Sequence, residues 1–312
     1  MQAGKTSELV AILLATRNGQ AFLDEQMRSL ADQTHATMDI WASDDGSTDR
    51  TMQILQEWQK RWDKGCFHIS QGPKKGFAEN FRALITNDKM QPDFIAFCDQ
   101  DDIWEPHKIE CALAWMRQQD EGLPLMFCSR TLNVTETGAR EGMSPLFNRK
   151  PSFRNALVQS IAGGNTMVLN ALAWQRLNEA SRRAEFVSHD WWSYLIVSGG
   201  GGVVNYCSEP LVRYRQHTGN VVGANTSWKA LLTRLRLVWS GRLSRWNDVN
   251  LAGLDRNRNI LTEDTLEVIE RFRHVRHGGF FSRLSGLAKS RIYRQTRRGT
   301  VALWLAAAFG RI

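Results

Sequence analysis

The sequence predicts an α/β fold in which helices cover both faces of a mostly parallel sheet. Three observations point to it. Apolar runs alternate with segments of helical periodicity through the N-terminal third, several of these runs end abruptly in acidic turns, and the 312 residues, 42% of them hydrophobic, can bury a substantial core. A chain of this length exceeds a typical single domain, so we expect one large domain with an appendage.

The elements follow one another in a regular order. The expected strands cover residues 8–16, 38–43, 67–70 and 92–98, and the expected helices cover residues 21–31, 51–62 and 77–86. Each helical segment places its apolar residues at a spacing of three and four, as Ile54, Leu55 and Trp58 do. Strands that alternate with helices in this way are typical of a parallel sheet.

Polar residues stand where three of these strands end. Residues 16–18 follow the first strand, Asp44 and Asp45 follow the second, and the sequence DQDD follows the fourth at residues 99–102. Ligands of such sheets bind beyond the carboxyl ends of the strands, so these groups are expected to converge on one ligand. Crowded carboxylates stay ionised when a cation holds them, and oxygen ligands suit Mg²⁺ or Mn²⁺. The alternative is a solvated acidic turn.

The common nucleotide-binding loops are missing from the sequence. It contains no GxxxxGK[ST] loop, and no GxGxxG follows the first strand. A nucleotide diphosphate can still bind if a metal ion neutralises its phosphates in place of a glycine-rich loop.

Six motifs in order resemble those of the inverting family 2 glycosyltransferases, which have a GT-A fold. They are LATRNG at 14–19, DDGSTD at 44–49, GFAENF at 76–81, DQDDIW at 99–104, HDWW at 189–192 and YRQH at 214–217. The resemblance covers roughly residues 8–225. The pairing of DQDDIW with HDWW is most similar to the rhamnosyltransferase-like subgroup, which builds bacterial surface polysaccharides.

The resemblance implies a set of nucleotide-binding residues. It makes Asp45 the partner of the pyrimidine N3–H, which suits uracil or thymine because cytosine lacks that proton. The set comprises Thr16, Arg17, Asn18, Asp44, Asp45, Asn80, Asp99 and Gln100. Asn80 would hold the ribose or the diphosphate, with Lys74 and Lys75 as weaker candidates. The alternative for Asp44 and Asp45 is a hydrogen-bonded turn.

The resemblance also implies a metal site and a catalytic base. Asp101 corresponds to the direct metal ligand, and Asp99 and His217 are further candidates for the metal. Asp190 corresponds to the base that takes the proton from an acceptor hydroxyl as that oxygen attacks the anomeric carbon. The alternatives are a helix cap for Asp190 and a structural role for His217.

A further group of residues is expected near the donor sugar and the acceptor. It comprises Gly164, Asn165, His189, Trp191 and Trp192. His189 would orient Asp190, and the two tryptophans would offer an apolar wall to the sugar. The alternatives are a plain turn for the glycine segment and core packing for the tryptophans.

The positive charge lies in the C-terminal part of the chain. The net charge is +8, yet residues 228–312 alone carry a net charge of +11. Arginines there interleave with aromatic and aliphatic residues, which suits helices lying on an anionic membrane, and the alternative is a basic subdomain packed on the core. We therefore expect a GT-A domain over residues 1–225 and a basic, amphipathic, membrane-associating helical region over residues 226–312.

The five cysteines show no CxxC spacing and are expected to be free thiols in a reducing compartment. The start of the chain lacks the layout of a signal peptide. Together these features predict a cytoplasmic protein, peripheral on the inner face of the cytoplasmic membrane.

The sequence therefore predicts a glycosyltransferase that uses Mg²⁺ or Mn²⁺. The expected donor is a dTDP- or UDP-sugar, with dTDP-rhamnose favoured, and the expected acceptor is a lipid-linked saccharide in the synthesis of a bacterial surface polysaccharide such as O-antigen. Two alternatives remain open: a non-catalytic nucleotide-sugar-binding partner of a synthase, and a family member that uses a UDP-hexose. Nucleic-acid binding through the basic region is disfavoured, because it gives the acidic turns no role.

Overall fold

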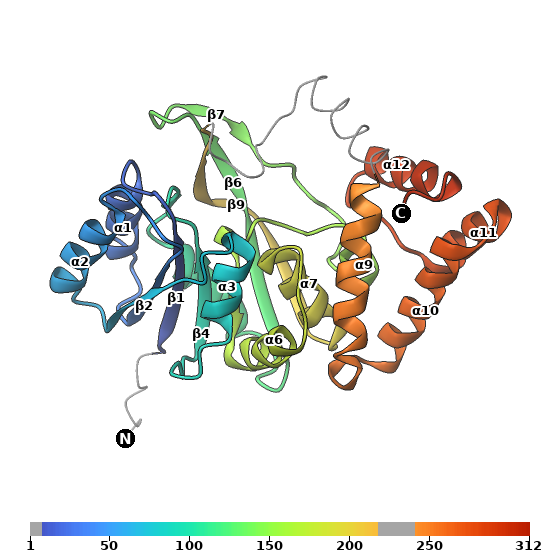
Figure 1. The fold of residues 1–312 in the computed structure, drawn as a ribbon, viewed down its shortest axis with the longest axis horizontal. Helices are drawn as coiled ribbons and strands as arrows, with labels where there is room; N and C mark the ends of the chain where they lie inside the picture. The colour runs from blue at the N-terminus through green and yellow to red at the C-terminus, as the bar shows by residue number, and fades with distance from the viewer. Residues whose placement is uncertain (1–7, 218–240) are drawn as a thin grey trace.

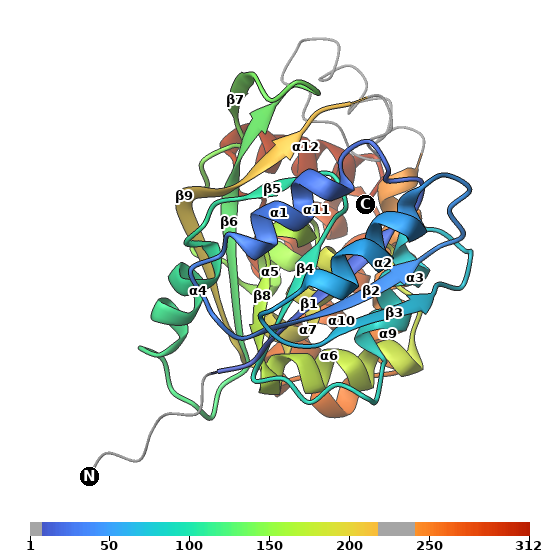
Figure 2. The same ribbon diagram turned by 90° about the vertical axis from the view of Figure 1, so that its left-hand side faces the viewer.

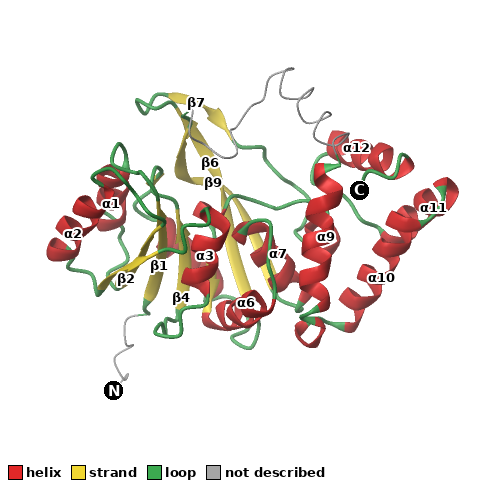
Figure 3. Ribbon diagram, viewed as in Figure 1, coloured by secondary structure: helices red, strands yellow, loops and turns green. Residues whose placement is uncertain are grey.

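A computed structural model describes residues 8–217 and 241–312 of the chain. Its described strands join into one mixed sheet in the order β3-β2-β1-β4-β8-β6-β9-β5, with β7 paired to β6 (Figures 1 and 3). The strands are β1 (Val10–Thr16), β2 (Met38–Asp44), β3 (Phe67–Gln71), β4 (Phe94–Cys98), β5 (Ile103–Trp104), β6 (Leu125–Val134), β7 (Arg140–Met143), β8 (Val168–Asn170) and β9 (Val203–Arg215).

The first half of the sheet is parallel, as the sequence predicts. In the register of β1 and β2, Thr16 lies opposite Asp44, and in that of β1 and β4, Leu14 lies opposite Cys98. The three strand ends therefore lie side by side, and the polar turns that follow them meet at one edge of the sheet.

The second half of the sheet is mixed. β8 runs antiparallel to both β4 and β6, β9 runs parallel to β6, and the short β5 runs antiparallel to β9. The β5–β9 pairing brings the segment after the DQDD turn against the strand that leads to His217. The predicted α/β fold is confirmed, with the parallel pairing confined to β3-β2-β1-β4 and β6–β9.

Helices cover both faces of the sheet. They are α1 (Leu23–Ala31), α2 (Thr51–Arg61), α3 (Phe77–Ile85), α4 (Lys108–Met116), α5 (Phe153–Ala156), α6 (Ala171–Arg183), α7 (His189–Gly199), α9 (Arg242–Asp255), α10 (Glu263–His277), α11 (Phe280–Ser290) and α12 (Arg297–Ala308), with the 3₁₀ turns η1 (Gly164–Thr166) and η2 (Arg258–Ile260).

Side chains along β1 point alternately to the two faces of the sheet, which explains the two layers of helices. Val10, Ile12 and Leu14 pack with α1, α2 and α4, whereas Ala11 and Leu13 pack with α3, α6 and α7 (Figures 1 and 2). A strand buried on both faces is nearly all apolar, which is why β1 shows a continuous run and no polar alternation.

Of the C-terminal helices, α9 lies beside α7, and α10, α11 and α12 lie on the other side of α9 (Figure 1). Leu254, Phe272 and Leu303 of these helices belong to the same buried cluster as Trp192 of α7. The helical nature of this region agrees with the sequence prediction. The expected boundary at residues 225 and 226 lies outside the described residues and stays a prediction. None of the described helices combines the length and the hydropathy needed to cross a bilayer.

Candidate active site

The turn after β2 is held together by Asp44. Its Oδ1 accepts hydrogen bonds from the hydroxyls of Thr16 (3.0 Å) and Ser47, and its Oδ2 accepts from the backbone N–H groups of Gly46 (3.2 Å) and Ser47 (2.9 Å). A carboxylate has about four lone-pair sites, and all four are occupied. Asp44 and Thr16 thus build the turn, and their expected contact with the nucleotide stays a prediction.

Asp45 joins this turn to the loop that precedes α3. Its Oδ1 accepts from the N–H of Lys74 (2.6 Å) and its Oδ2 from the N–H of Gly76 (2.8 Å). Asp45 is 3% exposed, and each oxygen keeps one further lone pair. Its role toward a pyrimidine stays a prediction.

Asn80 lies beneath the same turn. Its Oδ1 accepts from the hydroxyl of Ser43 (2.6 Å), its Nδ2 donates to the carbonyl of Ser43 (2.9 Å), and the side chain is 1% exposed. Asn80 thus fixes α3 against β2. The expected contact of Asn80 with ribose or diphosphate stays a prediction.

The turn after β1 is clamped from both sides. Gln100 accepts from the N–H of Arg17 (2.8 Å) and donates to its carbonyl (2.9 Å), while Asn18 Oδ1 accepts from the N–H of Thr48 (2.8 Å). Gln100 and Asn18 therefore use their side chains to join the three strand-end turns. Arg17 remains exposed at the edge where these turns meet.

The turn after β4 leaves its acids less satisfied. Asp101 and His217 lie together, with 2.8 Å between Asp101 Oδ2 and His217 Nε2. Burial and, to a smaller extent, the negative charges of Asp101 and Asp190 together raise the pKa of Asp99 to about 7. Asp99, Asp101 and Asp190 are thus brought close enough to repel one another, as the motifs predict.

Asp102 is buried and accepts hydrogen bonds from two other segments of the chain. Its Oδ2 accepts from the side-chain amide of Asn165 in η1, and its Oδ1 accepts from the N–H of Arg215 (3.3 Å) at the end of β9. Burial raises its pKa well above the usual value. Asn165 is 3% exposed and its side-chain amide positions Asp102, and its expected place near the sugar stays a prediction.

Lys108 is a charged residue of this region that the sequence analysis missed. It is fully buried, its Nζ lies 3.0 Å from the ring centroid of Trp104, and no hydrogen-bond partner is present among the described residues. Burial lowers its pKa to about 7, against the attraction of Cys98, Asp102 and Asp99. A helical spacing of four, which aligns Lys108 with the buried Ala112 and Met116, is the signal that could have found it.

Asp190 lies in the first turn of α7, where the helix N-terminus favours a negative charge. Its Oδ2 lies 3.3 Å from the hydroxyl of Ser160, whose single proton is shared between this carboxylate and the carbonyl of Ala162 (3.1 Å), and the residue is partly exposed. It is not the N-cap, which is Ser188. The carboxylate is therefore positioned by one weak hydrogen bond and faces the charges of the β4 turn.

His189 is packed as a neutral ring. It stacks on Phe81 with 3.7 Å between ring centroids, and burial lowers its pKa to about 4. A Cβ placed on Gly164 would lie 2.0 Å from His189 Nε2, so only glycine fits there. Gly164 and His189 thus form a close contact that supports the start of α7, and neither is shown to reach a sugar.

Trp191 and Trp192 belong to the core. Trp191 donates to the carbonyl of Ala156 (2.6 Å) and is 6% exposed, and Trp192 is 0% exposed and stacks on Phe186. The expectation that they form a wall for the sugar is corrected, because α7 buries both against α5 and α9.

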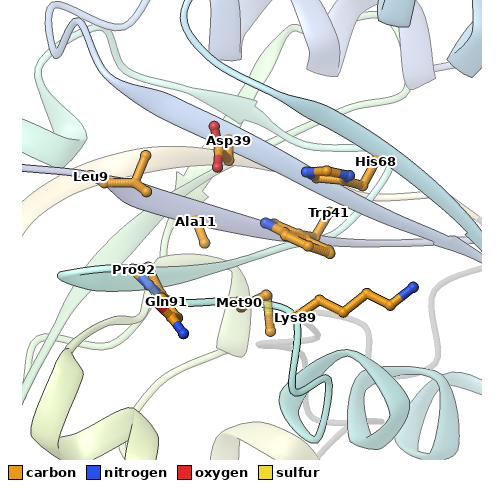
Figure 4. A pocket seen from close by; sticks show the side chains of 9 residues that line it. All are labelled: Leu9, Ala11, Asp39, Trp41, His68, Lys89, Met90, Gln91 and Pro92. Atoms are coloured by element: carbon orange, nitrogen blue, oxygen red, sulfur yellow. The ribbon is translucent and has the colours of Figure 1, made fainter.

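Two clusters of potential metal ligands lie elsewhere in the described chain: Asp39, Cys66 and His68, and His107, Cys111 and Glu209. In the described chain, the potential ligand atoms of Asp99, Asp101 and His217 do not all lie within 4.8 Å of one another, as those of the two clusters do. A cavity of about 280 Å³ near Asp39 and His68 lies at the amino ends of the parallel strands, where Trp41 and Lys89 also line it (Figure 4). It is therefore far along the strands from the acidic turns.

Comparisons with known proteins agree with this arrangement. The dTDP-rhamnosyl transferase RfbG of Shigella flexneri is 29% identical over 72% of this chain and 78% of its own length. The putative teichuronic acid biosynthesis glycosyltransferase TuaG of Bacillus subtilis is 25% identical over 71% of this chain and 84% of its own.

Solved structures share the fold. The TarS 1–349 fragment of S. aureus in complex with UDP-GlcNAc matches with a TM-score of 0.57 and 16% identity over 96% of this chain and 79% of that one. The chain covers 36% of a longer TarS structure. The protein-family model described as "Glycosyl transferase family 2" matches residues 11–175, more than half of the sequence. The chain therefore belongs to glycosyl transferase family 2 and is a glycosyltransferase with a GT-A-like fold.

Proposed function

We propose that this enzyme is a metal-dependent inverting glycosyltransferase that moves a sugar from a dTDP- or UDP-linked donor onto a lipid-linked saccharide. The observation that carries the proposal is the convergence of Asp99, Asp101 and Asp190, from the β4 turn and from α7, at the edge where three strand ends meet. L-rhamnose is the favoured sugar, supported by the 29% identity to a dTDP-rhamnosyl transferase.

The donor nucleotide would bind over the turns after β1 and β2. Arg17 is exposed there for the diphosphate, and the free lone pairs of Asp45 would accept the N3–H of uracil or thymine. Thr16, Asn18, Asp44 and Gln100 would act indirectly, because their hydrogen bonds fix the turns that carry these groups.

The residues of the β4 turn fit Mg²⁺ or Mn²⁺. Asp101, His217 and Asp99 would hold the ion, and Mg²⁺ commonly combines one or two protein carboxylates with substrate phosphates. Burial, and after it the negative charges of Asp101 and Asp190, raises the pKa of Asp99, and a divalent ion bound there would favour the ionised carboxylates. When bound, the ion would neutralise charge on the departing nucleotide diphosphate.

Asp190 would act as the base. In an inverting displacement, the acceptor hydroxyl oxygen bonds to the anomeric carbon, its proton passes to a carboxylate oxygen of Asp190, and the diphosphate leaves from the opposite face with the bonding electrons. The hydrogen bond from Ser160 would orient the carboxylate. Proton transfer of this kind typically contributes about 10² to 10⁴-fold to the rate.

The C-terminal helices would hold the enzyme at the cytoplasmic face of an anionic membrane. Phe280 and Phe281 at the start of α11 are 52% and 83% exposed, and Arg291, Arg297 and Arg298 are exposed nearby in the sequence. Exposed aromatics beside cations suit the headgroup region of such a membrane. Peripheral attachment would bring the active site to an acceptor that is itself anchored in lipid.

The test is a panel of nucleotide sugars with Mg²⁺ or Mn²⁺, scored for nucleotide diphosphate release with and without a bacterial lipid extract. Lipid-dependent turnover of dTDP-rhamnose supports the proposal. Turnover of a UDP-hexose alone would assign another donor within the family. Binding of donor without turnover, equal in wild type and Asp190→Asn, would identify a non-catalytic binding partner instead. Activity that survives chelation would contradict the role of Asp101.

A further inference from the structure

A second cavity lies where the chain leaves the core and enters α12. Its volume is about 540 Å³, and the segment before α5 and the first turn of α12 form its walls. The lining residues are Leu146, Asn148, Arg149, Gln295, Thr296, Arg297 and Thr300. None of them is acidic, and within the described chain neither arginine forms an ion pair with a carboxylate.

Three features of this cavity suit a ligand that carries a phosphate. The guanidinium of Arg149 is held 3.7 Å above the ring centroid of Tyr293, so it is partly fixed before any ligand binds. Arg297 opens α12, a helix of 12 residues whose N-terminus attracts negative charge. Guanidinium groups match phosphate oxygens with paired hydrogen bonds, which gives orientation as well as attraction.

A buried polar group points to hydroxyl groups on the same ligand. Gln295 lines the cavity, is 6% exposed, and its Oε1 has no hydrogen-bond partner among the described residues. A buried acceptor left unpaired is costly, so a donor from a ligand would stabilise it. Sugar hydroxyls are such donors.

An apolar track leaves the cavity along α12. Val301 and Leu305 follow Arg297 at steps of four residues, so all three lie on one helix face, and the two apolar side chains are 60% and 55% exposed. Leu146 at the cavity is 48% exposed. A ligand with a hydrocarbon chain beside its phosphate would cover this track.

The cavity is connected to the proposed base by two adjacent residues. The backbone N–H of Gln295 donates to Gln159 Oε1 (3.0 Å), and the next residue, Ser160, donates to Asp190 (3.3 Å). Gln295 and the proposed base are therefore linked through the Gln159–Ser160 segment.

We infer that this cavity binds the acceptor, and that its ligand is a saccharide joined through phosphate to a lipid. Arg149 and Arg297 bind the phosphate, Gln295 accepts from a sugar hydroxyl, and Val301 and Leu305 contact the start of the lipid chain. The inference rests on the proposed function and names the acceptor-binding residues for it.

The experiment measures binding by calorimetry in the presence of saturating dTDP and Mg²⁺, which occupy the donor site. The probe is dodecyl glucosyl phosphate, a sugar and a C12 chain joined by one phosphate, below its micelle concentration. The comparison ligands are dodecyl glucoside, glucose 1-phosphate and inorganic phosphate. The variants are Arg149→Gln, Arg149→Lys and Arg297→Gln, and Arg298→Gln is the matched control, because it removes a neighbouring charge of α12 that does not line the cavity.

We expect the probe to bind at least about tenfold more weakly to Arg297→Gln and Arg149→Gln, because each variant loses a charge-assisted hydrogen bond worth roughly 1.5 kcal/mol or more and 1.4 kcal/mol is about a factor of ten. Arg298→Gln should change the affinity by less than about twofold. Arg149→Lys keeps the charge and recovers part of the affinity. Dodecyl glucoside binds more weakly than the probe because it lacks phosphate, and glucose 1-phosphate because it lacks the chain.

Equal losses in Arg297→Gln and Arg298→Gln would overturn the inference and assign the binding to general positive charge. Glucose 1-phosphate or inorganic phosphate binding as tightly as the probe would overturn it as well, in favour of a soluble anion. Donor hydrolysis and dTDP affinity are measured in the same samples. Their absence in the wild type would defeat the proposed function, whereas normal values together with wild-type probe affinity in Arg297→Gln would defeat the acceptor site alone.

Discussion

The acidic turns after β2 and β4 look alike in the sequence and differ in how their carboxylates are satisfied. Asp44 accepts four hydrogen bonds, and both oxygens of Asp45 accept backbone N–H groups. In the β4 turn, burial and the neighbouring charges of Asp101 and Asp190 raise the pKa of Asp99 to about 7. The first turn is stabilised by its acids, whereas the second holds acids together against their repulsion.

This difference separates structural from functional acids. Carboxylates that accept several N–H and O–H groups are stable as anions and have little capacity left for a ligand. Carboxylates that repel one another at the edge of a sheet gain most from a cation or a proton, and such strained ionisation clusters at functional sites. Replacing acids in the two turns should therefore have opposite effects on folding and on activity.

The largest expected effect follows from Asp190→Asn. The amide keeps the shape of the side chain and cannot take a proton from the acceptor, so kcat should fall by about 10² to 10⁴-fold. Stopped assays of sugar transfer measure kcat, and calorimetry with dTDP measures donor binding, which should stay within about twofold. Ser160→Ala, which removes only the orienting hydrogen bond, should lose far less. Transfer at the wild-type rate in Asp190→Asn would remove Asp190 from the mechanism.

The next largest effect is expected on the free energy of unfolding when Asp44 in the β2 turn is replaced. Asp44→Ala leaves several buried donors unpaired and should lower the free energy of unfolding by about 2 to 4 kcal/mol, because hydrogen bonds to a charged group are worth roughly 1.5 to 3 kcal/mol each and are not additive. Urea titration measures it. Asp49→Ala, in the same turn but with fewer partners, should cost less. An unchanged free energy of unfolding in Asp44→Ala would show that the hydrogen bonds of the turn are dispensable.

In the absence of divalent ions, Asp99→Asn is expected to stabilise the protein, and by less than Asp44→Ala destabilises it. The pKa of Asp99 in the folded protein, about 7, lies above its value of about 3.9 in the unfolded chain. Between these pH values the folded state binds more protons, so wild-type stability falls as pH rises from 4 to 7. Asp99→Asn should remove this fall and raise the melting temperature at pH 8 by a few degrees.

Thermal unfolding across pH 4 to 8 tests this, with Asp44→Asn as the comparison from the other turn. Melting temperatures of Asp99→Asn that stay below those of the wild type at pH 8 would contradict the repulsion. Added Mn²⁺ should stabilise the wild type more than Asp99→Asn, because the ion offsets a repulsion that the variant lacks.

Lys108 should change the pH dependence of stability in the opposite direction to Asp99. Its pKa in the folded protein is about 7, below the ordinary value of 10.5, because burial disfavours the ammonium. Between pH 7 and 10.5 the unfolded state binds more protons, so this residue makes wild-type stability rise with pH. Lys108→Met should flatten that rise in melting curves from pH 7 to 9.5. A slope equal to that of the wild type would mean that Lys108 is charged when buried.

Much of the fold follows from the sequence because its signals are local. The expected strand at 38–43 is observed as Met38–Asp44 and the expected helix at 77–86 as Phe77–Ile85, since apolar periodicity is read within each segment. The antiparallel partners β8 and β5 were not predicted. They have three and two residues, too few to show a period.

The motifs predict that the acids gather beyond the strand ends, and the described structure places Asp101 against His217 and the charges of Asp101 and Asp190 close enough to act on Asp99. The roles of these residues stay predictions. The clamps could not be read from the sequence, because Gln100 binds the backbone of a residue 83 positions away and Asn165 binds Asp102 across 63 positions. Trp192 was misjudged for a similar reason: whether an aromatic residue at the start of a helix faces a ligand or the core depends on α9, which follows much later in the chain.

The central claim is that the β4 turn, and not the β2 turn, holds a divalent ion with the donor. Electron paramagnetic resonance of Mn²⁺ in the presence of dTDP measures this directly in wild type, Asp101→Asn and Asp49→Asn. The account predicts that Asp101→Asn weakens Mn²⁺ binding by about 10-fold or more, as loss of groups around a metal commonly does, while Asp49→Asn stays within twofold. Equal Mn²⁺ affinity in wild type and Asp101→Asn would contradict it.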